Sequence, residues 1–266
     1  MQNYLAKSLN LREELFKKFF LLKQGHPGSI FSIIDFLTVL YYGGFARRKK
    51  NKMLDHVIMS KGHATAGQFP ILKDLGIISK SDWNNWGTKK KSKLRIFGNN
   101  SINGISVTTG SLGHGVNVAA GLGYYYKTQK LKNKIYLIIS EGEFYEGSVW
   151  EGLLFISHHN LSNIKIFIDR NDLIILGNTE NLIKLEPLEK KMKSFGFATK
   201  TIDGHNHFKI EKRLKNISNL KKVSCTILKT VKGKGIKKME NKPEWHYWNN
   251  ISKKEFDKYF KSIRNK

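Results

Sequence analysis

Two short apolar runs, each followed at once by a polar cluster, constrain this chain more than any other feature. Residues 135–139 lead to Glu141, and residues 164–168 lead to Asn171. Continuous apolar runs of this length are typical of strands buried on both faces of a parallel sheet. The carboxyl ends of such strands meet at one edge of the sheet, where ligands bind. A carboxylate and an amide oxygen there can hold a hard divalent cation, and the cation can hold a diphosphate.

The rest of the chain alternates between strand and helix patterns, which predicts an α/β fold with a parallel β-sheet and helices on both faces. We expect strands at 56–59, 135–139, 164–168, 197–202 and 222–230. We expect helices at 5–22, 30–40, 64–75, 113–126, 148–159, 187–195 and 206–217. Residues 79–108 are polar and irregular, and this length favours a functional loop or lid over a simple connection.

The 266 residues, with 40% hydrophobic content, are enough for one large α/β domain or two small ones. The pattern favours a single domain over residues 1–266, with a tail from about 236 to 266 that packs on a partner subunit. The chain has no apolar run long enough to span a membrane and no signal-peptide core at its start. The single cysteine, Cys225, cannot form an internal disulfide, so we expect a cytoplasmic protein.

The formal net charge of +26 raises the question of a nucleic-acid partner. The lysines are scattered along the whole chain and arginine is scarce, whereas base recognition favours arginine. The charge pattern therefore indicates a solvated surface that attracts anionic sugar phosphates, and no nucleic-acid partner is expected.

A glycine cluster at residues 110–115 precedes the predicted helix 113–126. Glycines let the backbone approach a ligand, and the free N–H groups at a helix start attract anions. Such a cluster can also be only a tight turn, but the Glu141 and Asn171 clusters that follow it favour a cofactor wall. Three histidines, His26, His63 and His246, stand at predicted loop positions and could orient substrate hydroxyls, contact phosphate and move protons.

Taken together, these segments resemble the N-terminal, diphosphate-binding part of transketolase. The matching motifs occur in the family's order and cover nearly the whole chain: Gly25-His26-Pro27-Gly28, Ser60-Lys61-Gly62-His63, Thr108-Thr109-Gly110-Ser111-Leu112-Gly113, Glu141-Gly142-Glu143, Glu146-Gly147, Asp169-Arg170-Asn171, Asp203-Gly204-His205, Thr230-Val231-Lys232-Gly233-Lys234-Gly235 and Glu244-Trp245-His246. The resemblance implies a thiamin-diphosphate-binding fold, with thiamin diphosphate and Mg²⁺ or Ca²⁺ as cofactors.

The resemblance also implies roles for individual residues. The metal ligands fall on Glu141, Asn171 and the backbone carbonyl of Leu173. The contacts to thiamin diphosphate fall on His63, Gly110, Ser111, Leu112, Gly142, Glu143, Asn171 and His246. The catalytic set comprises His26, His63, His246, Glu146 and Glu151. The two glutamates match acids that connect active sites across a dimer interface, although their spacing alone indicates only favourable charges at a helix start.

The chain departs from the family pattern at several positions. The family's Gly-Asp-Gly reads Ser140-Glu141-Gly142, and the longer side chain meets a metal that tolerates little geometric error. Arg170 places a cation where it could neutralise phosphate or repel the metal. The segment around Phe97 lacks the family's histidine, and Tyr247 stands where glycine is common.

The resemblance covers only the diphosphate-binding part, which implies a split enzyme. A second, C-terminal subunit would supply the pyrimidine-binding domain, in a dimer of heterodimers. The expected reaction is transfer of a two-carbon ketol unit from a ketose phosphate to an aldose phosphate, as in pentose phosphate metabolism. Two alternatives stay open: a related thiamin-diphosphate enzyme with a different substrate in specialised sugar metabolism, and a degenerate, non-catalytic subunit.

Overall fold

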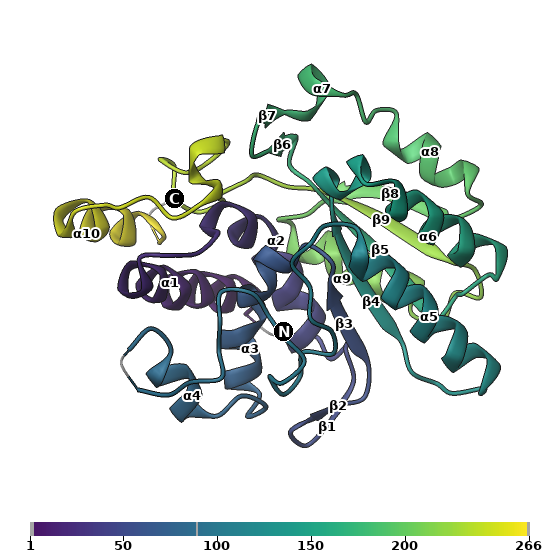
Figure 1. The fold of residues 1–266 in the computed structure, drawn as a ribbon, viewed down its shortest axis with the longest axis horizontal. Coiled ribbons are helices and arrows are strands. Elements are labelled where there is room, and N and C mark those ends of the chain that lie inside the picture. Colours follow the sequence, from purple (N-terminus) through teal and green to yellow (C-terminus); the bar gives the residue numbers. More distant parts are fainter. Residues whose placement is uncertain (1–2, 89, 265–266) are drawn as a thin grey trace.

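Five parallel strands form the central sheet, in the order β3-β4-β5-β9-β8 (Figure 1). The computed structural model describes residues 3–88 and 90–264. The strands are β3 (His56–Met59), β4 (Ile135–Ser140), β5 (Ile164–Arg170), β9 (Ser224–Lys229) and β8 (Ala198–Asp203). Each lies within one or two residues of its predicted position. The parallel sheet confirms the predicted α/β class.

The two apolar runs become neighbouring strands in register. Ser140 at the end of β4 pairs with Asp169 near the end of β5, so Glu141 and Asn171 emerge at the same edge of the sheet. Every residue of β5 is buried, as is β4 up to its last residue. This burial on both faces explains why the runs are continuously apolar instead of alternating.

Helices cover both faces of the sheet, as predicted. Alternate residues of β4 face opposite layers: Tyr136 and Ile138 join one apolar cluster, while Ile135, Leu137 and Ile139 join the other. The first face is covered by α1 (Tyr4–Leu22), α2 (Pro27–Tyr42), α3 (Phe69–Asp74) and α9 (His207–Ile217). The second face is covered by α5 (His114–Thr128), α6 (Gly147–His158) and α8 (Leu188–Ser194). Within the described residues, none of the helices has the length and apolarity that a membrane crossing requires.

Several short elements complete the chain between these layers. A 3₁₀ helix, η1 (Gly62–Gln68), precedes α3, so the predicted helix 64–75 begins as a tighter turn. The irregular region 79–108 contains α4 (Lys80–Asn85) and is anchored by buried Trp83 and Trp86. Two antiparallel hairpins are formed by β1 (Arg48–Lys49) with β2 (Lys52–Met53), and by β6 (Leu173–Ile174) with β7 (Gly177–Asn178). The second hairpin leads into α7 (Thr179–Leu182) at the carboxyl edge of the sheet.

The C-terminal tail packs its apolar side on its own chain. The tail contains a 3₁₀ turn, η3 (Pro243–His246), and α10 (Lys253–Ser262), which lies beside α1 (Figure 1). Phe256 of α10 stacks on Phe16 of α1 with ring centroids 5.1 Å apart, and Trp248 lies 5.4 Å from the same ring. These aromatic side chains are therefore already buried, and contact with a partner through the outer side of the tail stays a prediction.

A buried ion pair joins α1 to α2. Arg12 donates two hydrogen bonds to the carboxylate of Asp35, at 3.0 and 2.7 Å, and both residues are almost fully buried. His205 and His207 also contact this carboxylate, at 2.7 and 3.1 Å. Burial alone would raise the pKa of Asp35, but Arg12 and the two histidines hold the pKa well below its usual value. The pair therefore fixes the α1–α2 layer to the segment after β8.

We expect Asp35→Leu to lower the free energy of unfolding by about 3–5 kcal/mol, because it leaves a buried guanidinium without its counter-ion. The double variant Arg12→Met/Asp35→Leu should recover much of this loss, since no charge is then buried. Urea titration followed by far-UV circular dichroism measures both. A single variant as stable as the wild-type chain would show that the pair is unimportant.

Candidate active site

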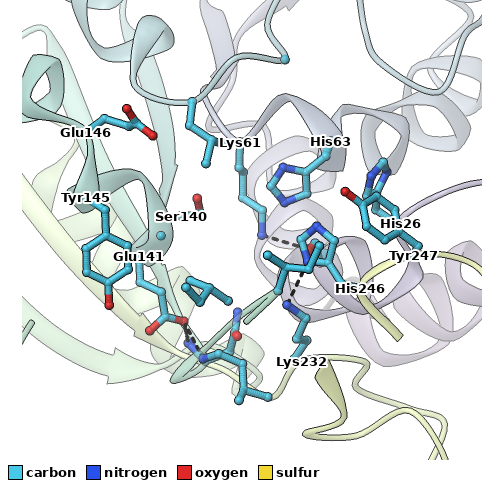
Figure 2. Close-up of a pocket in the computed structure, with 18 of the residues that line it drawn as sticks. His26, Lys61, His63, Ser140, Glu141, Tyr145, Glu146, Lys232, His246 and Tyr247 are labelled. Atoms are coloured by element: carbon cyan, nitrogen blue, oxygen red, sulfur yellow. Dashed lines mark hydrogen bonds between the residues drawn. The ribbon is translucent and has the colours of Figure 1, made fainter. Parts of the chain in front are cut away.

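A cavity of about 360 Å³ opens at the carboxyl edge of β3, β4 and β5 (Figure 2). Its lining includes most of the residues singled out from the sequence: His26, His63, Gly110, Leu112, Glu141, Gly142, Glu146, Asn171, Leu173 and His246. It also includes residues that sequence reasoning did not assign: Ser29, Lys61, Phe97, Ser140, Tyr145, Ile174, Ile175, Lys232 and Tyr247. The topology thus brings together segments from both ends of the chain.

Tight backbone contacts shape the cavity wall. A side chain at Gly62 would place its Cβ 2.4 Å from the backbone of Thr109, so only glycine lets η1 approach the glycine turn that precedes α5. Gly113 ends that turn with a φ of 81°, in the left-handed region that glycine adopts without strain. These contacts hold the backbone of Gly110 and Leu112 at the cavity.

The three predicted histidines form a triangle on one side of the cavity (Figure 2). The ring centroids of His26, His63 and His246 lie 5.3 to 5.5 Å apart. Burial, together with the nearby lysines, lowers the pKa of His26 to about 4 and that of His246 to about 3, and the pKa of His63 is also lowered. All three imidazoles are therefore neutral near pH 7. Nδ1 of His26 is buried and has no hydrogen-bond partner among the described residues, so it is available to a ligand.

Two buried lysines lie beside the histidines. The Lys61 ammonium forms an ion pair with Asp169 and donates to the Ser29 carbonyl at 3.0 Å. The Lys232 ammonium lies 3.2 Å from Nδ1 of His246, and within the described residues it forms no ion pair. Burial, and then the charge of Lys61, lower the pKa of Lys232 to about 8. A buried cation that no carboxylate contacts directly is suited to an anionic ligand such as a diphosphate.

Three oxygen atoms converge at the end of β5, which is where the sequence predicts a metal. With the Asn171 amide turned so that its oxygen faces the other two, this oxygen lies 3.1 Å from the Leu173 carbonyl oxygen and 3.3 Å from a carboxylate oxygen of Glu141; in the opposite orientation the amide nitrogen donates to both. These acceptors repel one another unless a proton or a cation lies between them. Turning the amide by 180° would supply N–H protons, and a divalent cation would satisfy all three oxygens as they stand. The separations are close to the roughly 3.0 Å between adjacent ligands of octahedral Mg²⁺, so the donor set fits this ion.

Among the described residues, no cluster of three or more histidine, cysteine or acidic side chains could hold a metal. The candidate metal position therefore relies on one carboxylate together with an amide and a backbone oxygen. Burial raises the pKa of Glu141 to about 7, opposed by Arg170 and by the Asn171 backbone N–H. A bound cation would favour the charged form of this carboxylate.

Three of the expected residues do not line the cavity. Glu143 is fully buried beneath the glycine turn, where it accepts hydrogen bonds from the Ser60 hydroxyl, from the Gly113 N–H at 3.2 Å and from the Ser140 N–H at 2.8 Å. Ser111 is exposed beside the cavity and Glu151 is exposed on α6. Glu143 therefore holds the wall in place, and does not line the cavity.

Known proteins share this arrangement. Residues 18–255 match the family model described as transketolase, thiamine diphosphate binding domain. An apulose-4-phosphate transketolase subunit of Actinobacillus succinogenes is 34% identical over 229 residues, which cover 84% of this chain and 82% of the relative. A 6-deoxy-6-sulfo-D-fructose transketolase subunit of a Clostridium species is also 34% identical, over 235 residues and the same shares of both chains.

A solved structure extends the comparison to three dimensions. Transketolase from Campylobacter jejuni matches with a TM-score of 0.82 and 26% sequence identity, over 93% of this chain. The match covers 41% of the Campylobacter jejuni chain. The present chain thus spans most of the length of the two subunit relatives, and less than half of that solved transketolase.

The charge on Lys232 leads to a pH prediction. With a pKa of about 8 in the free protein, Lys232 loses its proton as pH rises through 8, whereas a bound diphosphate favours the charged form. Calorimetric affinity for inorganic pyrophosphate should fall by up to about tenfold per pH unit above this value. In Lys232→Met, affinity should be lower throughout and this fall should be absent. The same pH profile in both proteins would exclude Lys232 as an anion-binding group.

Proposed function

The chain belongs to the transketolase family, and from that premise we propose that it is the diphosphate-binding subunit of a two-subunit transketolase. The enzyme transfers a two-carbon ketol unit between sugar phosphates, with those of pentose phosphate metabolism as the first donors to test. The observation that carries the proposal is the cavity itself, which combines buried cations, neutral histidines and converging oxygens at one sheet edge. The single buried cysteine fits the proposed cytoplasmic location.

Different cavity residues would bind different parts of the proposed cofactor. Lys61 and Lys232 offset the charge of a diphosphate, and the oxygens of Glu141, Asn171 and Leu173 hold Mg²⁺ or Ca²⁺. When bound, thiamin diphosphate supplies an electron sink for cleavage of the carbon–carbon bond beside a ketose carbonyl. The backbone of the glycine turn and of Gly142 forms the opposite wall.

The three histidines would contact the substrate, and His63 and His246 would also contact the cofactor. Neutral imidazoles can donate or accept hydrogen bonds, so they can orient the hydroxyl groups of a ketose and accept a proton from one of them. The unpartnered Nδ1 of His26 provides one such contact. Phe97 and Tyr247 pack on the His26 ring, with centroids 5.5 and 5.0 Å away, and help to exclude water from this side of the cavity.

A complementary subunit would complete the active site. Relatives of nearly the same length are named as transketolase subunits, whereas the solved transketolase is more than twice as long as its matched part. The outer side of α5 and α6 exposes a set of apolar side chains: Val118, Tyr124, Tyr125, Leu154 and Phe155. These helices lie side by side (Figure 1) and also carry Glu151 on their exposed side. This face supports the proposed dimer of heterodimers, with Glu146 and Glu151 near the junction.

A related enzyme with a different substrate is the second candidate, favoured by two aromatic residues. Phe97, 42% exposed, and Tyr247, 54% exposed, stand at the cavity where the family has histidine and glycine. An apolar ring cannot bind a substrate hydroxyl as an imidazole does, and a tyrosine side chain takes up space that glycine leaves open. These positions therefore point to a donor or acceptor other than the usual sugar phosphates.

We expect Asn171→Ala to abolish metal-dependent binding of thiamin diphosphate without unfolding the chain, because it removes one of three converging oxygens. The measurement is calorimetric titration of the cofactor, with and without Mg²⁺, in complex with the complementary subunit. Asn181→Ala, on the exposed side of α7, is the matched control and should bind as the wild type does. Unchanged affinity in Asn171→Ala would overturn the whole site assignment.

The second candidate makes its own prediction. If Phe97 limits the donor, Phe97→His should raise kcat/KM for ketopentose phosphates by about tenfold, since a substrate hydroxyl gains a partner. Steady-state rates with a panel of ketose donors test this. A wild-type chain that already prefers ketopentose phosphates, with no gain in the variant, would favour the first candidate.

A further inference from the structure

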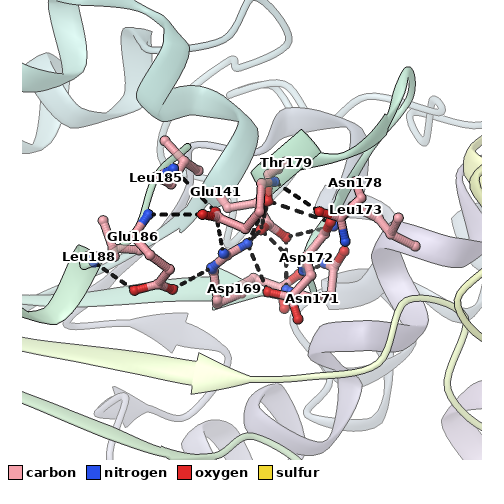
Figure 3. A network of polar contacts seen from close by, with 12 residues as sticks. Glu141, Asp169, Asn171, Asp172, Leu173, Asn178, Thr179, Leu185, Glu186 and Leu188 are labelled. Atoms are coloured by element: carbon pink, nitrogen blue, oxygen red, sulfur yellow. Dashed lines mark hydrogen bonds and ion pairs between the residues drawn. The ribbon is translucent and has the colours of Figure 1, made fainter. Parts of the chain in front are cut away.

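Arg170 is a buried cation that contacts residues behind the cavity. It is 1% exposed and does not line the cavity. Its guanidinium forms an ion pair with Glu141 and donates to the Thr179 hydroxyl at 2.8 Å. It also pairs with three further carboxylates, at 2.8 to 3.2 Å: Asp172, Glu180 and Glu186. One side chain thus connects β5 to a separate segment of the chain. Figure 3 shows the polar network around Glu141, Thr179 and Glu186.

That segment, residues 172–187, we term the strap. It contains β6, β7 and α7, and its first part supplies Leu173 and Ile174 to the cavity lining. Besides Arg170, Glu141 and Tyr145 also hold the strap to the sheet edge: Glu141 accepts from the N–H groups of Asp172 and Leu173, at 3.1 and 3.3 Å. The Tyr145 hydroxyl donates to the Ile183 carbonyl at 2.9 Å and lies 3.4 Å from that of Thr179. The strap buries Leu185 in the apolar core but exposes other large apolar side chains, including Leu176 at 78%, so apolar burial fixes it at one point only.

The two carboxylate oxygens of Glu141 have different hydrogen-bond partners. Oε2 accepts from Arg170 and from the Asp172 N–H at 3.1 Å. Oε1 accepts from the Asn171 N–H at 2.8 Å and from the Leu173 N–H at 3.3 Å, and it faces the side-chain amide of Asn171. Because Arg170 occupies Oε2, the carboxylate cannot rotate freely, and Oε1 stays directed toward the side chain of Asn171 and the carbonyl of Leu173. The longer side chain of glutamate is thereby held at a defined position.

The charge around Arg170 removes the objection that it would repel a metal ion. Four carboxylates surround this single guanidinium, so the local charge is negative when all of them are ionised. The nearest of them, Glu141, lies between Arg170 and the converging oxygens. A divalent cation at those oxygens therefore meets a net attractive field, although the chain as a whole carries +26.

We infer that Arg170 is a positioning residue: it fixes Glu141 for metal and diphosphate binding and fastens the strap to the sheet edge. The inference rests on the proposed function for its metal and diphosphate, but its structural half does not. Arg170 contacts neither ligand, and it acts by holding the atoms that do.

The first experiment is hydrogen–deuterium exchange on the full chain without cofactor. Arg170→Met should raise exchange at the backbone N–H groups of 171–173 and of the strap at least tenfold, while the strands of the sheet stay protected. Arg170→Lys keeps the buried charge but cannot bind several carboxylates at once, so exchange should rise less. The lysine variant decides the matter if Arg170→Met fails to fold. Lys229→Met is the matched control, because Lys229 contacts only Asp172 of this network, at 3.6 Å, and should leave 171–173 unchanged.

The second experiment measures binding of Mn²⁺ with inorganic pyrophosphate, by electron paramagnetic resonance. The wild-type chain and Lys229→Met should bind alike, and both Arg170 variants at least tenfold more weakly. No binding by the wild-type chain would overturn the proposed function and the metal half of the inference. The hydrogen–deuterium exchange experiment would then still test whether Arg170 fastens the strap to the sheet edge. Wild-type binding with unchanged exchange and affinity in both Arg170 variants would overturn the inference and leave the proposed function standing.

Discussion

The in-register pairing of β4 with β5 is the constraint on which the site depends. Because Ser140 lies opposite Asp169, the residues that follow each strand meet at one edge. A shift by one residue would turn the strand side chains toward the wrong layers, since alternate residues of β4 belong to different apolar clusters. The core that fixes this register therefore also fixes the separation between Glu141 and Asn171.

Charge is arranged in two zones on either side of that edge. The cavity side holds Lys61 and Lys232, of which only Lys61 has a carboxylate partner among the described residues. The strap side holds Arg170 within a group of four carboxylates. The three converging oxygens lie between a zone that attracts a diphosphate and a zone that tolerates a cation. This order of charges is what a metal-bridged diphosphate requires.

Periodicity and motif order were enough to predict the parallel sheet, because burial on both faces leaves a direct mark on a sequence. The direction in which a side chain points cannot be predicted from the sequence pattern in the same way. Glu143 belongs to a motif that faces the cavity, yet it is buried beneath the glycine turn. Lys61 and Lys232 look like any other lysine in a basic chain until the fold buries them. The apolar residues of the tail did not reveal whether they pack on α1 or on another chain, since aromatic rings suit both.

The burial of Lys232 bears on whether the subunit has lost its activity. Lowering its pKa from 10.5 to about 8 corresponds to a cost of about 3 kcal/mol for holding the charge in the cavity. An uncharged side chain of similar length would make a purely structural subunit more stable, so the lysine is best explained by an anion that offsets the cost. The same reasoning applies to His26, whose buried Nδ1 has no partner among the described residues. A buried cation without a carboxylate partner among the described residues, and a buried ring nitrogen without a hydrogen-bond partner, favour a site that still binds its ligand over a degenerate one.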